Sequence, residues 1–196
     1  MGKEAKKKEI LKSAIKVFAR NGIANTKISD IAIEANMSKG NIYLYFESKE
    51  EIIKESIRSY LAKLDKAGAD HVAGVGDPIN KLCNIIDAWM NAIVSSYEET
   101  KLIIFFWAEG LGLDNVIDGY NLKEVYNNYR LFLSGILEEG ISDGKIYPVD
   151  TKLMASVIIG ALDGLVLHWI IGKDIFDLEK AIDLFKKSTI ETLRIV

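Results

Sequence analysis

The sequence predicts an all-α protein: an N-terminal three-helix helix-turn-helix domain followed by a helical ligand-binding and dimerisation domain. Apolar residues recur at helical spacing along most of the chain, and no segment shows sustained alternation with turn signals. Only two prolines, Pro78 and Pro148, interrupt 196 residues. A composition of 49% hydrophobic and 27% charged residues is ordinary for a globular protein and excludes a disordered chain.

The first two helices are marked by residues that start and stop helices. Residues 4–20 place apolar side chains on one face, and Gly22 follows them as a typical C-terminal glycine. Thr26 is expected to cap a short helix over residues 28–35.

The next elements follow a tight turn. Ser38 is expected to cap a helix over residues 39–46. Ser48 and Glu51 form a capping-box pattern that opens a long helix over residues 49–67. Asp77 and Pro78 begin another helix, and Asp150 and Asp177 are the expected caps of the last two. The remaining helices are expected at 100–109, 121–139, 150–171 and 177–195. We therefore expect residues 1–47 to form the helix-turn-helix domain and residues 48–196 the body, with 48–67 connecting them.

Two short helices joined by a turn of three or four residues form the bare helix-turn-helix. Ala32 and Ala35 are small enough to let the second helix cross the first closely. This arrangement leaves Lys39, Asn41 and Tyr43 pointing outward near the start of the second helix. The N-terminal residues of such a helix are those that reach base edges in DNA.

The segment over residues 10–53 contains Phe18, Gly22, Thr26, Ile31, Ala32, Ala35, Ser38, Lys39, Gly40, Ile42, Tyr43, Tyr45, Phe46, Lys49 and Glu50. This pattern resembles the TetR family of transcriptional regulators. Two positions depart from the family pattern: Asn36 replaces a usual glycine, and Lys27 replaces a common small hydroxyl residue. Asn tolerates a left-handed backbone, so the turn should survive. The resemblance implies a helical body whose last two long helices form a dimer interface.

The expected DNA-binding residues divide by chemistry. Lys39 suits guanine acceptors and Asn41 suits adenine, whereas Gly40 lets the backbone approach the groove and Tyr43 could read bases or bind phosphate. The other residues are better suited to positioning on the sugar-phosphate backbone. Tyr43 and Tyr45 could alternatively be partly buried packing residues. The positioning set, with the cap Ser38 included, is Thr26, Lys27, Ser38, Tyr45 and Lys49.

The charge distribution indicates that the N-terminal part of the chain binds a polyanionic partner. Residues 1–60 hold 12 Lys and Arg against 8 Asp and Glu, whereas the remainder holds 13 against 20. A basic head on an acidic body is typical of a nucleic-acid-binding protein, although chance scatter could produce the same split.

Residues 153–171 form an apolar run long enough to span a membrane. Asp163 lies at its centre, where a carboxylate would cost about 2.5–3.5 kcal/mol in a bilayer. A helix buried inside a homodimer explains the run better, so no membrane partner is expected. Gly160 and Gly164 lie four residues apart and would let a partner helix pack closely. Two-fold symmetry would place two recognition helices about 34 Å apart on an inverted-repeat operator in double-stranded DNA. The expected interface comprises Gly160, Gly164, Leu178, Ile182 and Phe185.

The body is rich in aromatic residues with a few polar groups among them, as small-molecule sites are. A cationic or aromatic effector would suit this set, although aromatic residues at helical spacing are usually plain core. The candidate ligand-binding residues are Trp89, Phe106, Trp107, Glu109, Tyr126, Tyr129, Asp163, His168 and Trp169.

Enzyme motifs are weak in this sequence. The segment from Gly140 to Gly144 matches G-x-S-x-G, but a nucleophile elbow needs a preceding strand, and here a helix precedes it. Two histidines and one cysteine form no metal-binding spacing, and we expect no cofactor. A single cysteine, Cys83, and the absence of a signal-peptide pattern favour the cytoplasm.

The sequence therefore favours a sequence-specific DNA-binding regulator, a repressor released from its operator by a small molecule. The alternative is a DNA-binding regulator with no small-molecule effector.

Overall fold

The computed structural model describes residues 2–108 and 122–195, and side chains for 2–104 and 123–195. These residues form helices joined by turns, with one isolated antiparallel bridge between Ile146 and Arg194. The predicted all-α class is confirmed.

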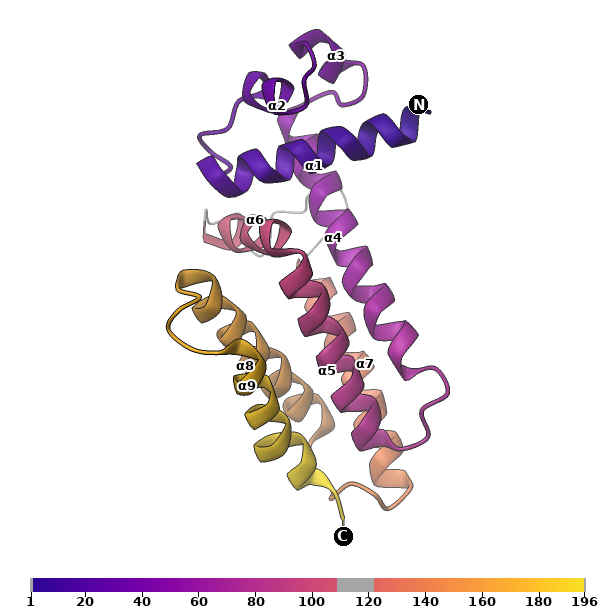
Figure 1. Cartoon of the computed structure of the whole chain (residues 1–196). Helices are drawn as coiled ribbons and strands as arrows, with labels where there is room; N and C mark the ends of the chain where they lie inside the picture. The colour runs from indigo at the N-terminus through magenta and orange to yellow at the C-terminus, as the bar shows by residue number, and fades with distance from the viewer. Residues whose placement is uncertain (1, 109–121, 196) are drawn as a thin grey trace. The chain divides into compact units, whose positions relative to one another are not determined.

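Three helices form the N-terminal head: α1 (Lys3–Asn21), α2 (Ile28–Glu34) and α3 (Lys39–Tyr43) (Figure 1). One large apolar residue from each of them is fully buried, namely Phe18, Ile31 and Ile42. The three helices thus pack through buried apolar residues, with α2 in contact with both α1 and α3.

Three helices follow: α4 (Lys49–Val72), α5 (Pro78–Ser95) and α6 (Tyr97–Ala108). The prediction that α4 ends at residue 67 is wrong, because the helix continues through Gly68. A Cβ atom at Gly68 would lie 2.9 Å from Nε1 of Trp89, so the missing side chain is what lets the two helices pack closely. Tertiary packing therefore overrides the low helix propensity of glycine.

The last three helices are α7 (Leu122–Ser142), α8 (Thr151–Ile171) and α9 (Leu178–Phe185). The predicted caps of α8 and α9 are confirmed: Asp150 accepts from the Leu153 amide at 3.0 Å, and Asp177 accepts from the Lys180 amide at 3.1 Å.

The prediction of one continuous final helix over residues 177–195 is wrong. After α9 the chain makes a π-helical turn over Lys186–Ile190 and a 3-10 turn over Glu191–Leu193. The end of the chain then pairs with the segment after α7. The Tyr147 amide donates to the Leu193 carbonyl at 3.0 Å, and the Ile195 amide donates to the Lys145 carbonyl at 2.9 Å. These extended contacts are incompatible with an α-helix.

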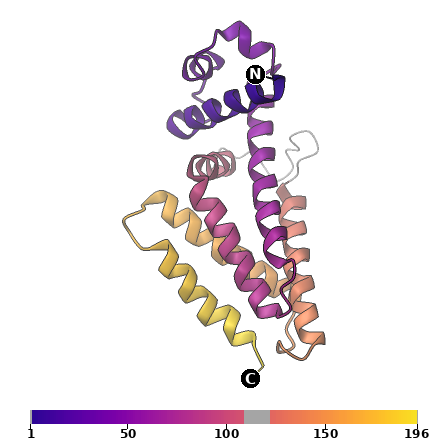
Figure 2. The same cartoon turned by 45° about the vertical axis from the view of Figure 1, so that its right-hand side comes forward.

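The chain divides into two compact units, each with its own packing. Unit one comprises residues 1–65 and 92–120, and unit two comprises residues 66–91 and 121–196. In unit one, α1 contacts α2 and α6, and the Tyr60 hydroxyl of α4 lies 3.0 Å from Oγ1 of Thr100 of α6. In unit two, α8 packs against α7 and α9, and Figure 2 shows α8 and α9 side by side.

The boundary expected at residues 47 and 48 falls inside unit one. The first turns of α4 belong to this unit, where Ile52 and Ile53 are buried. The expected division at residues 47 and 48 is thus a division by role, into a DNA-binding head and an effector-binding body. The two compact units divide the chain at other residues.

Candidate nucleic-acid interface

The turn between α2 and α3 is held by one backbone conformation and one cap. Asn36 adopts a positive φ of 50°, the left-handed conformation that the family usually gives to glycine. Ser38 caps α3, since its Oγ accepts from the Asn41 amide at 3.2 Å. Both expectations for this turn are confirmed.

The recognition helix is shorter than expected, ending at Tyr43 instead of residue 46. Its turn nevertheless continues, because the amides of Tyr45 and Phe46 donate to the Ile42 carbonyl at 3.0 and 3.1 Å. Burial of Ile42 and Phe46 holds this segment against the head.

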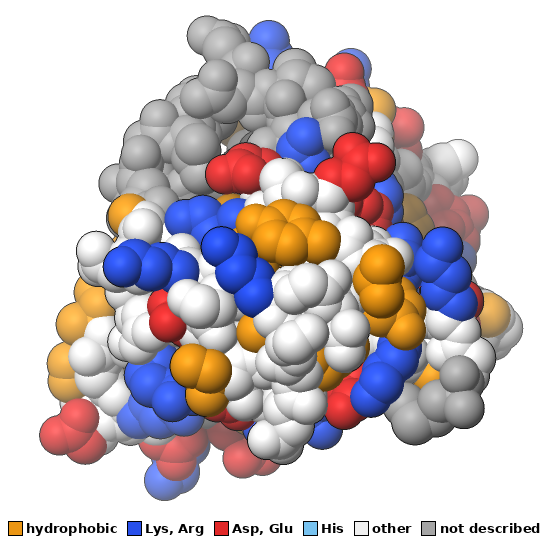
Figure 3. Space-filling model, turned by 90° about the horizontal axis from the view of Figure 1, so that it is seen from above, with side chains coloured by type: hydrophobic (Ala, Val, Ile, Leu, Met, Phe, Trp, Pro, Cys, Tyr) orange, Lys and Arg blue, Asp and Glu red, His pale blue; other side chains and the backbone are white. Residues whose placement is uncertain are grey.

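The side chains expected to read bases lie on the surface. Lys39, Gly40 and Asn41 are exposed, and Tyr43 is 47% exposed. Nζ of Lys39 lies 5.9 Å from the centroid of the Tyr43 ring, a cation–π distance. Tyr43 is therefore no core residue, whereas Tyr45 is half-buried. Seen from above, the face in Figure 3 carries separate Lys and Arg side chains around a mostly uncharged centre, with exposed hydrophobic patches between them.

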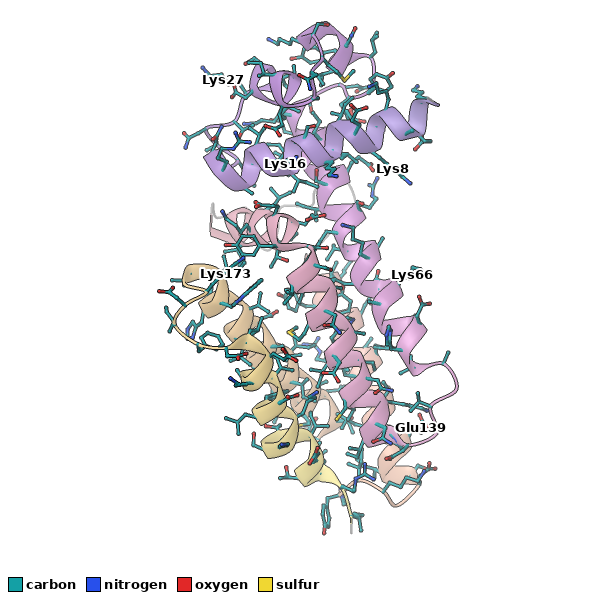
Figure 4. The ribbon with its side chains drawn as sticks, in the orientation of Figure 1. Lys8, Lys16, Lys27, Lys66, Glu139 and Lys173 are labelled. Carbon is teal, nitrogen blue, oxygen red and sulfur yellow. The ribbon has the colours of Figure 1, made fainter. Side chains whose placement is uncertain are left out.

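The expected roles of Thr26 need correction, whereas the phosphate contact expected of Lys27 stays a prediction. Thr26 is 1% exposed, and its hydroxyl donates to the Gly22 carbonyl at 2.7 Å, so it neither caps α2 nor offers its hydroxyl to a phosphate. Lys27 occupies the N-cap position, and its amide donates to the Asp30 carboxylate at 2.9 Å. The Lys27 side chain is exposed, and Figure 4 labels it at the start of α2.

Lys49 also differs from expectation. Its Nζ donates to the main-chain carbonyls of Ile23 at 3.0 Å and Thr26 at 3.1 Å. Two of its three ammonium hydrogens are thus directed into the head, because these carbonyls belong to the loop between α1 and α2. Its first role is to hold this loop, and a phosphate contact could use only the remaining hydrogen.

The predicted capping box at the start of α4 forms with one shift. The Glu51 amide donates to Oγ of Ser48 at 3.1 Å, as expected. The Glu51 carboxylate accepts from the Glu47 amide, one residue before the capping position. The recognition segment therefore runs directly into a capped α4.

An ion-pair cluster between α1 and α2 was not anticipated from the sequence. Arg20 of α1 lies 2.9 Å from the Glu34 carboxylate of α2, and Lys16 lies 3.7 Å from it. The hydrogen bond from Arg20 holds the pKa of Glu34 below its usual value. Two cations of the basic head are thus directed toward a carboxylate, whereas the side chains of Lys27 and Lys39, at the starts of α2 and α3, are exposed.

The expected dimer face is open on α8. A Cβ atom at Gly160 or Gly164 would meet no atom within 4 Å. Together with these two glycines, exposed apolar residues make a row on one helical face at steps of three or four residues: Leu153, Val157, Leu167 and Ile171. By length and composition α8 could cross a membrane, and only 28% of its most apolar 18-residue stretch is buried inside the chain.

On α9 the expected interface residues are wrong in part. Leu178 and Ile182 are only 7% and 4% exposed, so they belong to the core of the chain itself. They face inward because α9 packs on α8 within unit two. Phe185 is half-buried, and Leu184 is the exposed large apolar residue of this helix.

Of the candidate ligand-binding residues in unit two, four make two contacting pairs. The rings of Trp89 and Tyr129 lie 5.4 Å apart between centroids at a tilt of 52°. Tyr126 of α7 is hydrogen-bonded to Asp163 of α8; burial raises the pKa of this carboxyl, and the hydrogen bond partly opposes the rise. Trp169 is buried, with Nζ of Lys173 4.9 Å from its ring.

One other candidate is not brought to these residues, and three cannot be compared with them. His168 is exposed and lies four residues from Gly164, on the open face of α8, so its expected place among the buried aromatic residues is wrong. The Phe106 and Trp107 side chains and all of Glu109 lie outside the described residues.

The G-x-S-x-G segment does not have the context of a nucleophile elbow. Gly140 lies inside α7, which ends at Ser142, and Gly144 makes a turn with a φ of +65°. A helix therefore leads into this serine where an elbow needs a strand.

The capped α3, the exposed Lys39 and Asn41, and the tight turn at Asn36 together define a helix-turn-helix DNA-binding protein. Comparison with known proteins agrees. Residues 10–55 match the family of bacterial regulatory proteins called tetR, and residues 60–191 match the C-terminal region of YsiA-like proteins. The chain belongs to the TetR family of transcriptional regulators.

Named relatives share most of the chain. It is 28% identical over 177 residues to the fatty acid metabolism regulator protein of Bacillus subtilis, covering 90% of this chain and 89% of the relative. It is 28% identical over 150 residues to the HTH-type transcriptional repressor KstR2 of Rhodococcus jostii, covering 73% and 69%. A crystal structure of the regulator FadR from Bacillus subtilis in complex with stearoyl-CoA matches with a TM-score of 0.71 at 26% identity, covering 94% of this chain and 96% of that one.

Proposed function

We propose that this protein is a cytoplasmic homodimeric repressor, without enzymatic activity or a membrane partner, that binds an inverted-repeat operator in double-stranded DNA and leaves it when a small molecule binds the body. The observation that carries the proposal is the exposure of Lys39, Asn41 and Tyr43 on a capped recognition helix. Lys39 and Asn41 carry the side chains suited to guanine and adenine edges. The open face of α8 supports the dimer that an inverted repeat requires.

A fatty acyl-CoA thioester is the first candidate effector. The support is the relative that was crystallised with stearoyl-CoA, together with the aromatic residues Trp89, Tyr129 and Trp169 in unit two, which could line an acyl chain. The sequence alone favours a cationic or aromatic ligand, because aromatic residues accompany Glu109 and Asp163, so a cationic aromatic compound is the matched competitor.

The signal is proposed to travel through α4. This helix begins directly after the recognition segment and contributes residues to both compact units. A ligand can change DNA affinity only by binding one arrangement of the two units better than another. Coupling of this kind is typically about 1–3 kcal/mol, and it must be reciprocal.

The test has two stages. A duplex is first selected from a random-sequence pool, and the size of the complex is measured; an inverted repeat bound by an even number of chains is expected, and tight binding of one chain to a single half-site would refute the dimer. Stearoyl-CoA, free CoA and a cationic aromatic dye are then titrated into the complex. Stearoyl-CoA should weaken DNA binding, and DNA should weaken stearoyl-CoA binding by the same factor. If none of the compounds changes DNA affinity, a regulator without a small-molecule effector is favoured.

A further inference from the structure

We propose that Leu44 is a specificity-determining residue of the DNA interface, and that its side chain contacts the C5 methyl group of a thymine in the major groove. The inference rests on the proposed DNA-binding function and adds to it an apolar contact that polar candidates such as Lys39 and Asn41 cannot make.

Leu44 directly follows α3 and is 71% exposed. Ile42 and Phe46, two residues before and two residues after it, are both buried. The Leu44 amide donates to the Asn41 carbonyl at 3.3 Å, so the helical turn extends through this residue. The chain thus turns this leucine outward while its alternate neighbours hold the segment to the head.

Helical spacing places Leu44 on the recognition surface. It lies three residues after Asn41 and four after Gly40, and residues at these spacings are neighbours on a helix face. A Cβ atom at Gly40 would meet only Oγ of Ser38, at 3.9 Å, so the space before Leu44 is open. A row of Gly40 and Leu44 therefore runs beside the row of Lys39 and Tyr43.

The chemistry of the major groove gives this apolar row one natural partner. Each base pair presents hydrogen-bond donors and acceptors there, and thymine adds the C5 methyl group, to which apolar side chains bind. Leucine can form no hydrogen bond with a base or a phosphate. A leucine that enters the groove beside Asn41 is therefore stabilised best by a methyl group.

Exposure alone does not distinguish Leu44, because single exposed apolar residues are common. Ile33 is 76% exposed as well, but it lies on α2, the helix before the recognition helix, and not on α3 or the turn that continues it. Ile33 thus offers a matched control: a similar side chain, similarly exposed, on the preceding helix of the same module.

The experiment uses the full chain and the tightest duplex selected from a random-sequence pool. Each thymine of the half-site is replaced by deoxyuridine, in both halves at once, which removes the C5 methyl group and leaves the hydrogen-bonding edge intact. At one position of the half-site, this replacement should lower the affinity of the wild-type protein by about fourfold for each methyl group that is removed from contact. In Leu44→Ala the same replacement should have no effect, whereas Leu44→Met and Ile33→Ala should retain the loss.

Three results would overturn the inference: a selected site without thymine, a wild-type protein indifferent to every deoxyuridine, or a loss that persists in Leu44→Ala. Each of these three results is obtained with a duplex that the protein binds, so it refutes the role of Leu44 and leaves the proposed DNA-binding function intact. Failure to select any duplex would instead refute the proposed function and the inference together. Circular dichroism of each variant checks that it is folded.

Discussion

Nζ of Lys49 lies 3.1 Å from the carbonyl oxygen of Thr26, so the first residue of α4 is bound to the loop that precedes α2. The same ammonium group also binds the Ile23 carbonyl at 3.0 Å. A side chain that the sequence places next to DNA is therefore part of the scaffold that fixes the helix-turn-helix on α4.

Replacing Lys49 with methionine should destabilise the head. The change leaves two carbonyl oxygens without their charged donor, and hydrogen bonds to charged groups contribute about 1.5–3 kcal/mol. Hydrogen exchange of the amides in α1 and α2 should become faster. Lys8→Met, an exposed lysine of α1, is the control and should change little. Unchanged exchange in Lys49→Met, with a reduced salt dependence of DNA binding, would restore the phosphate role.

Lys39→Ala and Asn41→Ala should relax base preference, because each good base contact contributes about 1–3 kcal/mol of discrimination. Lys27→Ala should instead weaken binding to all sequences alike and reduce the salt slope by about one unit. Affinities for the selected duplex and for a scrambled duplex are measured over a series of salt concentrations. Equal losses on both duplexes for Lys39→Ala and Asn41→Ala would reverse the assignment.

Gly160→Leu and Gly164→Leu should dissociate the dimer while the chain stays folded. Within one chain a side chain at either glycine meets open space, whereas a closely packed partner helix would be pushed away. Overpacking of this kind typically costs about 1–3 kcal/mol. Analytical ultracentrifugation measures the dissociation. Gly135→Leu on α7 is the matched control, since Gly135 also faces open space. Dimers of unchanged stability would place the interface elsewhere.

Asp163→Asn should stabilise the protein at neutral pH, and the gain should disappear in acid. Burial raises the pKa of Asp163 in the folded state above its ordinary value of 3.8. A raised pKa means that the folded state binds the proton more tightly, so this contribution to stability is present below pH 3.8 and is lost as the pH rises through the folded pKa. The asparagine variant lacks this ionisation and keeps an acceptor for Tyr126.

Thermal unfolding of both proteins from pH 4 to pH 8, followed by tryptophan fluorescence, measures the difference. Asp174→Asn, at an exposed carboxylate of the loop before α9, is the control. A constant difference between Asp163→Asn and the wild-type protein over the whole range would show that ionisation of Asp163 plays no part.

The sequence by itself determined the features that depend on neighbouring residues. Caps such as Ser38, Asp150 and Asp177 act within one helical turn, so their hydrogen bonds could be predicted from spacing alone. The left-handed backbone of Asn36 followed from its place in the family pattern. The presence of helices, the all-α class and the exposure of Lys39, Asn41 and Tyr43 could also be predicted, because helical spacing assigns residues to the faces of a helix.

Only the tertiary structure decided which way a side chain turns when partners lie far away in the sequence. Lys49 binds carbonyls 23 and 26 residues earlier, and the apolar pattern of α9 cannot say whether Leu178 and Ile182 face α8 of their own chain or a second copy. Gly68 stays helical because Trp89, on another helix, occupies the space of its missing side chain. Spacing along the chain fixes the faces of a helix, but the packing of distant elements determines which face is buried and which remains free for DNA or a partner.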